Sequence, residues 1–150
     1  MIEIYVDADA SPVKEEVFRV ARRYGFKVFL VSNSRMKVPK DLPVEMVLVK
    51  DHFDAADDWI VENIHEDDIA VSADILLASR CLKKDARVID PKGRVFTKET
   101  IGSALADREL SAYLRDTGGI TGGPAPYGKR DRSRFLQQLD GLIRTVLRGG

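Results

Sequence analysis

The chain has 150 residues and a formal net charge of zero, because 24 Lys and Arg balance 24 Asp and Glu. Its length favours one domain over residues 1–150, and a hydrophobic content of 44% is enough for a core. No apolar run reaches the ~18–20 residues that a membrane span needs, and the lone Cys81 excludes an intrachain disulfide. We therefore expect a cytoplasmic protein without a membrane partner.

The zero net charge conceals two oppositely charged halves. Residues 1–74 carry 16 acidic and 9 basic residues, a net of −7, whereas residues 75–150 carry 8 acidic and 15 basic residues, a net of +7. Such asymmetry indicates a charged ligand, unless the fold mixes the halves and leaves no patch. The sequence leaves both alternatives open.

Strand and helix signals alternate from residue 2 to residue 89. Ser11 before Pro12 predicts a helix N-cap and a first-turn proline, and Gly25 predicts the end of that helix. The strands are predicted at 2–6, 27–31, 44–49, 69–72 and 87–89, and further helices at 54–64 and 75–83. This alternation predicts an α/β fold, a three-layer α/β/α sandwich with a mostly parallel central sheet.

The remainder of the chain has weaker patterns. A turn at 91–93 and a hairpin arm at 94–96 are followed by one or two short helices between residues 98 and 115. Residues 118–124 are glycine-rich, and a last helix with a broad apolar face begins near Asp131. We expect this glycine-rich loop and helix (116–148) to pack on the same domain.

Aspartates follow two of the predicted strands. Asp7 and Asp9 come after the first strand, and Asp74 comes after the fourth, at the edge where parallel α/β sheets bind ligands. Asp54 and Asp57 share one face of a predicted helix start. Clustered carboxylates raise each other's pKa unless a cation neutralises them, and oxygen ligands suit Mg²⁺ or Mn²⁺ better than zinc. The pattern therefore indicates a divalent metal site.

Each of these acids also has a structural interpretation. Asp54, Asp57 and Asp58 are placed to cap a helix or to interact with its dipole. Asp67 and Asp68 precede a strand, and we expect them to be solvated in a polar turn. Asp7 and Asp74 favour function, because a carboxylate beside a buried sheet is costly without a partner.

A metal ion held by carboxylates can activate water and stabilise charge on a phosphodiester. Such a substrate is negatively charged, so it also needs basic residues near the metal. The last helix begins with four bases in six residues: Lys129, Arg130, Arg132 and Arg134. These bases, with Asn33 and Ser34 at the end of the second strand, are the predicted substrate-binding residues. The alternatives are a solvated helix start and ordinary turn chemistry at Asn33 and Ser34. Tyr127 is expected to anchor the loop rather than to stack on a base.

Five segments of the sequence resemble a known family. They are 7–13 (Asp-Ala-Asp-Ala-Ser-Pro-Val), 54–60 (Asp-Ala-Ala-Asp-Asp-Trp-Ile), 72–78 (Ser-Ala-Asp-Ile-Leu-Leu-Ala), 122–124 (Gly-Gly-Pro) and 131–135 (Asp-Arg-Ser-Arg-Phe). In this order they resemble the motifs of the bacterial YaiI/YqxD family, over residues 4 to about 139. One departure is Ser11, where the family commonly has cysteine, so a thiol there is not an obligatory part of shared chemistry.

The family is similar to PIN-like domains, and this resemblance implies a sheet of order 3-2-1-4-5. PIN-like nucleases cleave RNA with Mg²⁺ or Mn²⁺ held by acidic residues, so the resemblance implies single-stranded RNA, or another phosphodiester, as the partner. By this resemblance Asp7 and Asp74 are the strand-end acids and Asp57 is the helical acid, whereas Asp9 and Asp54 are secondary candidates. The predicted catalytic residues are thus Asp7, Asp9, Asp57 and Asp74, and the predicted metal ligands are Asp7, Asp54, Asp57 and Asp74.

Two other functions stay open, as does a homo-oligomeric state. Residues 6–9 and 31–34 resemble the first two motifs of haloacid-dehalogenase-type phosphohydrolases, in which Asp7 would be a nucleophile and Asp9 a general acid. The lysine and the late acid pair of those enzymes are not identifiable in this chain. The third function is a non-catalytic RNA-binding or protein-interaction domain.

Overall fold

A computed structural model describes residues 2–9, 11–50, 54–116 and 127–149. The glycine-rich stretch at 118–124 lies outside these residues. Among the described helices none is both long and apolar enough to cross a membrane.

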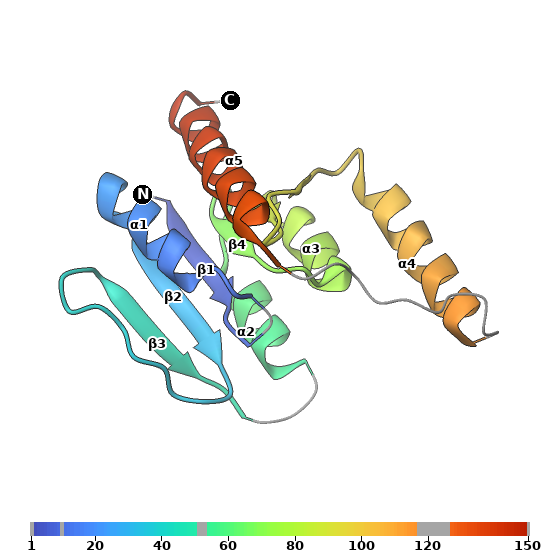
Figure 1. Cartoon of the computed structure of the whole chain (residues 1–150), viewed down its shortest axis with the longest axis horizontal. Helices are drawn as coiled ribbons and strands as arrows, with labels where there is room; N and C mark the ends of the chain where they lie inside the picture. The colour runs from blue at the N-terminus through green and yellow to red at the C-terminus, as the bar shows by residue number, and fades with distance from the viewer. Residues whose placement is uncertain (1, 10, 51–53, 117–126, 150) are drawn as a thin grey trace.

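Six strands of the described chain form one sheet of order β3-β2-β1-β4-β5-β6 (Figure 1). Their bounds are β1 (Glu3–Asp7), β2 (Lys27–Ser32), β3 (Val44–Leu48), β4 (Ile69–Val71), β5 (Arg87–Ile89) and β6 (Val95–Phe96). β1 to β5 are parallel, and β6 adds an antiparallel edge. The predicted order 3-2-1-4-5 is confirmed, and the chain reverses its direction of strand addition between β1 and β4.

Helices cover both faces of the sheet, as the strand–helix alternation predicts. One face carries α1 (Lys14–Tyr24) and α5 (Lys129–Leu147), and the other carries α2 (Ala55–Asn63) and α3 (Ile75–Leu82). The remaining described helix, α4 (Ile101–Asp116), packs against α3 and projects away from the sheet (Figure 1). Ile4 and Val6 of β1 belong to the core beneath α1 and α5, whereas Tyr5 belongs to the core beneath α2 and α3. Successive side chains of a strand point to opposite faces, which explains this division.

The predicted start of the first helix is wrong. α1 begins at Lys14, and Val13 occupies the N-cap position without a side-chain hydrogen bond. The Ser11 hydroxyl instead donates to the Val71 carbonyl oxygen at 3.5 Å, which ties the loop after β1 to the end of β4. Gly25 ends α1 as predicted, in the left-handed conformation with φ of 74°.

The last helix begins slightly earlier than the sequence predicts. α5 starts at Lys129 because the Asp131 carboxylate accepts the Gly128 N–H at 3.0 Å and so caps the first turn. Phe135, Leu139 and Ile143 are fully buried against the sheet and α1, so this helix packs on the fold as expected.

The turn between β5 and β6 requires glycine at position 93. Gly93 has φ of +91°, and a Cβ there would lie 2.7 Å from Arg134 Cγ and 2.8 Å from the Arg134 carbonyl carbon. We expect Gly93→Ala to lower the free energy of unfolding by ~2–4 kcal/mol, because it combines backbone strain with a clash. Gly25→Ala is the control, since Gly25 also has positive φ but no atom within 4 Å of an added Cβ. It should cost ~1 kcal/mol in urea unfolding, and equal losses for the two variants would contradict the clash.

Candidate functional site

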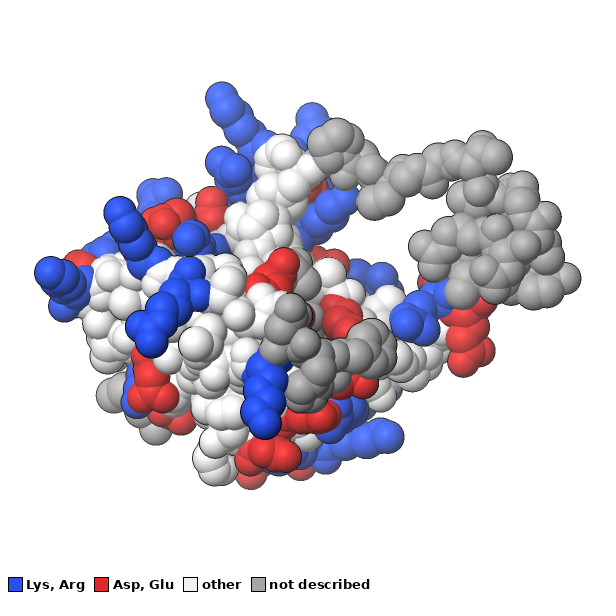
Figure 2. Space-filling model, turned by 90° about the horizontal axis from the view of Figure 1, so that it is seen from below, with Lys and Arg blue, Asp and Glu red and all other residues white. Residues whose placement is uncertain are grey.

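The strands β1, β2, β4 and β5 all end at one edge of the sheet, which is the lower edge in Figure 1. Ligands of open α/β sheets bind beyond this edge where the strand order reverses, which here is between β1 and β4. Figure 2 looks onto this edge: acidic side chains gather in the middle of the face, and several Lys and Arg side chains stand at its rim.

Asp7 lies at the centre of this edge, as the last residue of β1. Its side chain is buried, with 6% of the residue exposed, and one carboxylate oxygen accepts the Ser72 hydroxyl at 3.0 Å. Burial raises the pKa of Asp7, the Ser72 hydrogen bond lowers it, and the charges of Asp74 and Asp9 raise it further. A buried carboxylate of this kind is costly without a counter-charge.

Asp74 lies beside Asp7 and also caps a helix. Its carboxylate accepts the N–H groups of Leu76 at 2.9 Å and Leu77 at 3.3 Å, at the start of α3. Its own N–H donates to the Ser72 hydroxyl oxygen at 3.0 Å, so Ser72 joins the two acids. Sequence reasoning missed Ser72, although a polar residue between a strand end and an acid was a usable signal.

Asp57, in the first turn of α2, reaches the same acids from the other side of the edge. Its pKa is raised to about 7, first by burial and then by the charges of Asp74 and Asp7, and the protonated carboxyl forms a side-chain hydrogen bond to Asp74. Two carboxyl groups in contact must share a proton or a cation. The structure thus brings Asp7, Asp57 and Asp74 within electrostatic range of one another.

Asp54 and Asp9 border this group. Asp54 occupies the N-cap position of α2 with φ of 66°, but its side chain makes no cap hydrogen bond, so the capping interpretation is wrong for this residue. Asp9 is held at the end of β2, where it accepts the Ser32 hydroxyl at 2.6 Å and the Asn33 N–H at 2.9 Å. Asp9, Asn33, Asp54 and Asp57 line a hollow of about 90 Å³ together with Lys50.

The polar residues that follow β2 support one another. Ser34 donates its N–H to the Ser32 hydroxyl oxygen at 3.1 Å, next to the Ser32 contact with Asp9. Asn33 and Ser34 are exposed at the same edge as Asp7. Their predicted role in binding substrate stays a prediction.

The predicted basic cluster divides between two sides of α5. Lys129 and Arg132 line a hollow of about 380 Å³ between α1 and α5, where Arg132 Nε lies 3.7 Å from Glu16 Oε1. Arg134 packs on the turn that contains Gly93. The Tyr127 hydroxyl donates to the Pro91 carbonyl oxygen at 2.8 Å, so Tyr127 ties the chain before α5 to the β5–β6 turn.

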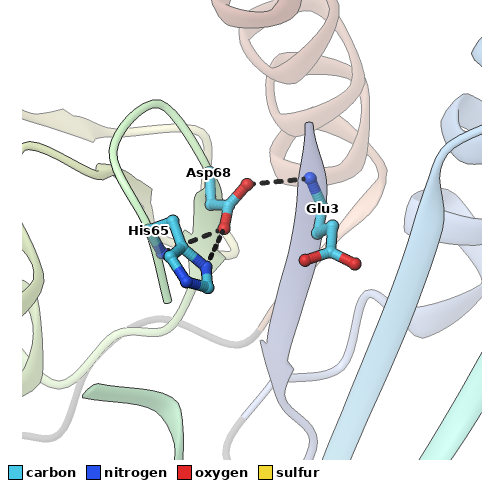
Figure 3. A group of neighbouring side chains, drawn as sticks. All are labelled: Glu3, His65 and Asp68. Carbon is cyan, nitrogen blue, oxygen red and sulfur yellow. Dashed lines mark hydrogen bonds and ion pairs between the residues drawn. The ribbon is translucent and has the colours of Figure 1, made fainter. Parts of the chain in front are cut away.

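A different group of potential metal ligands lies at the opposite edge of the sheet (Figure 3). Glu3, His65 and Asp68 are the described residues that bring three such atoms within 4.8 Å of one another, a spacing that Asp7, Asp57 and Asp74 do not reach. Asp68 is buried, which contradicts the prediction of a solvated turn. Its carboxylate accepts the N–H groups of Glu3 and His65, each at 3.0 Å, and so braces β1 to the turn before β4.

Comparison with known proteins identifies the family. Residues 5–145 match the sequence model described as "Uncharacterized BCR, YaiI/YqxD family". The chain belongs to the YaiI/YqxD family. The resemblance in the sequence motifs is therefore confirmed, and the site at the end of β1 and β4 is a feature of a YaiI/YqxD protein.

Curated YaiI/YqxD relatives share the whole length of the chain. A UPF0178 protein of Rhodospirillum centenum is 54% identical over 153 residues, covering 99% of each chain. A UPF0178 protein of Sphingopyxis alaskensis is 54% identical over 97% of this chain and 96% of its own, and one of Rhodospirillum rubrum is 49% identical over 99% of each. No solved structure matches the chain. The names of these relatives state no activity, so a function must be argued from the chemistry of the site.

Proposed function

We propose that this protein is a Mg²⁺- or Mn²⁺-dependent ribonuclease or phosphodiesterase that acts at the edge where β1 and β4 end. The observation that carries the proposal is the convergence of Asp7, Asp57 and Asp74 at this edge, where Ser72 links Asp7 to Asp74 and where burial and the charges of Asp74 and Asp7 raise the pKa of Asp57. Charge repulsion among three carboxylates disfavours their joint ionisation, and a divalent cation would relieve it.

The donor types suit a hard cation, which would draw the three carboxylates closer together than they lie in the structure. Asp7, Asp57 and Asp74 offer carboxylate oxygens, and Asp54 adds another from the start of α2. An ion held there would activate water and stabilise charge on a phosphodiester. Ser72 holds one oxygen of Asp7 in place, and Ser32 and Asn33 hold Asp9 at the border of the site. In this proposal Asp9 is the general base, which would accept a proton from the attacking water.

The burial of Asp7 favours hydrolysis by water over a phosphohydrolase mechanism. A nucleophilic aspartate must present an accessible oxygen to phosphorus, whereas Asp7 is only 6% exposed and one of its two oxygens accepts the Ser72 hydroxyl. Positive charge for a polyanionic substrate is supplied by Lys50, which lines the hollow with Asp9, Asp54 and Asp57, and by the bases at the start of α5, beside α1 and the β5–β6 turn. Single-stranded RNA is therefore the proposed substrate.

The test is an incubation of the purified chain with end-labelled single-stranded RNA in EDTA, Mg²⁺ or Mn²⁺. We expect metal-dependent cleavage that falls about 100-fold in Asp74→Asn, since the amide removes the charge while asparagine still caps α3. Glu62→Gln is the control, because Glu62 is exposed on α2 and takes no part in the described acidic site.

Two results would contradict the proposal. Hydrolysis of p-nitrophenyl phosphate without RNA cleavage would indicate a phosphohydrolase. RNA binding without either reaction would indicate a binding domain.

A further inference from the structure

The turn after β5 lies next to the acidic site and presents bases that the sequence pattern did not single out. β5 pairs with β4, and the Ser72 N–H donates to the Ile89 carbonyl oxygen at 3.1 Å, so the turn begins one strand away from Asp74. Neighbouring strands are ~4.8 Å apart. Lys92 and Arg94 are therefore carried at the same edge as the proposed metal ligands.

The side chain of Asp90, within the turn, and contacts with α5 together fix the conformation of the turn. The Asp90 carboxylate accepts the N–H groups of Lys92 at 3.0 Å and Arg94 at 2.8 Å. Tyr127 bonds to the Pro91 carbonyl oxygen, and Gly93 lies directly on Arg134, so the turn and the start of α5 form one rigid unit. The backbone that carries these bases therefore needs no ordering when a ligand binds.

The bases of the turn and of α5 flank Gly93 from the two faces of the sheet, because Arg94 lies over Phe96 on the side of α2 and α3 while Arg134 contacts Gly93 from α5. Arg130 and Arg134 are four residues apart and share one helix face, and Arg134 contacts the turn. The Arg94 guanidinium stacks over the Phe96 ring at 5.0 Å, which leaves its edge for a phosphate. Arg94, Arg130 and Arg134 are exposed and form no ion pair with any described residue, in contrast to Arg132, which pairs with Glu16.

We infer that Lys92, Arg94, Arg130 and Arg134 form a phosphate-binding ridge that holds the backbone of single-stranded RNA beside the acidic site. The inference rests on the proposed function for the choice of RNA, and it adds the side of the site along which the strand runs. Lys and Arg neutralise backbone phosphates independently of sequence, so the ridge supplies affinity and position rather than base specificity.

The ridge is tested by binding in the absence of metal, where cleavage plays no part. The variant is Arg94→Gln/Arg130→Gln, and the control is Lys83→Gln/Arg148→Gln, which removes two exposed charges from the ends of α3 and α5. Binding of a fluorescent 12-nucleotide oligouridylate is followed by anisotropy in EDTA between 50 and 200 mM KCl. We expect about 10-fold weaker binding for the ridge variant, and a salt slope reduced by about 1.4, since each lost contact to a single strand removes about 0.7.

The outcomes separate this inference from the proposed function. Equal affinity and salt slope for the ridge variant and the wild type would overturn the ridge, even if the wild type cleaves RNA with Mn²⁺. An equal loss in the control variant would also overturn it, because the effect would then follow net charge. Weakened binding confined to the ridge variant would support the ridge, even if no cleavage occurs and the proposed nuclease activity is wrong.

Discussion

Asp7→Asn is expected to lower the rate of Mn²⁺-dependent RNA cleavage by about 100- to 1,000-fold. Asp7 is the buried acid of the site, and it lies where Asp74 and Asp9 both raise its pKa. An asparagine keeps the shape of the side chain and still accepts the Ser72 hydroxyl, but it carries no charge to hold a cation. The measurement is single-turnover cleavage of end-labelled RNA with saturating enzyme.

Stability measurements distinguish a lost charge from a damaged fold. Because burial disfavours the ionised form of Asp7, the neutral amide should leave the free energy of unfolding unchanged or higher at pH 8. Asp67→Asn is the matched control, since Asp67 lies at the opposite edge of the sheet in a positive-φ conformation that asparagine tolerates. Full activity in Asp7→Asn, or an equal loss in Asp67→Asn, would exclude Asp7 from the reaction.

Asp57→Asn is expected to stabilise the protein at pH 8 but not at pH 4. The pKa of Asp57 is about 7 in the folded chain, against an ordinary value of 3.8. Between these values the unfolded chain has released a proton that the folded chain keeps, so the free energy of unfolding falls as pH rises through this window. Asparagine removes that loss, and because the side chain is only partly buried we expect a gain of ~1–2 kcal/mol rather than the full conversion.

Urea unfolding at pH 4 and pH 8, with and without Mn²⁺, measures this effect. In the wild type at pH 8, Mn²⁺ should raise the free energy of unfolding by binding the folded state, and in Asp57→Asn that gain should shrink. Asp58→Asn is the control, because Asp58 is exposed on the same helix and pairs with Arg80 at the surface. Its effect should stay below about 0.5 kcal/mol at both pH values. Identical pH profiles for Asp57→Asn and the wild type would contradict the raised pKa.

The placement of the acids illustrates what the sequence could predict. Asp7 and Asp74 follow short β-rich runs, and parallel strands end at one edge, so local pattern and topology together brought them to the same place. The buried face of α5 was likewise predictable, because Phe135, Leu139 and Ile143 recur at helical spacing. Signals of this kind are local or periodic, and a single sequence carries them in full.

Contacts between distant segments were decided only by the tertiary structure. Ser72 bonds to Asp7 across 65 positions of the chain, and Asp57 meets Asp74 because α2 and α3 pack side by side. Arg132 turns toward Glu16 while Arg134 turns toward the β5–β6 turn, which the run of bases does not indicate.

The opposite net charges of the two halves likewise did not predict which charged residues contact one another. The composition established a net of −7 and a net of +7, but not which charges the fold would neutralise. Arg80 pairs with Asp58, Arg87 with Asp67 and Arg132 with Glu16. Each of these ion pairs joins a base of the second half to an acid of the first half, so part of the opposite charge is neutralised by contacts between the halves. Asp7, Asp57 and Asp74 instead meet one another, because the strand order places their segments at one edge.

Sequence determined the inventory of charges and the periodic elements that carry them. Packing decided which charges meet, because Coulomb energies depend on distances and burial that exist only in the folded chain.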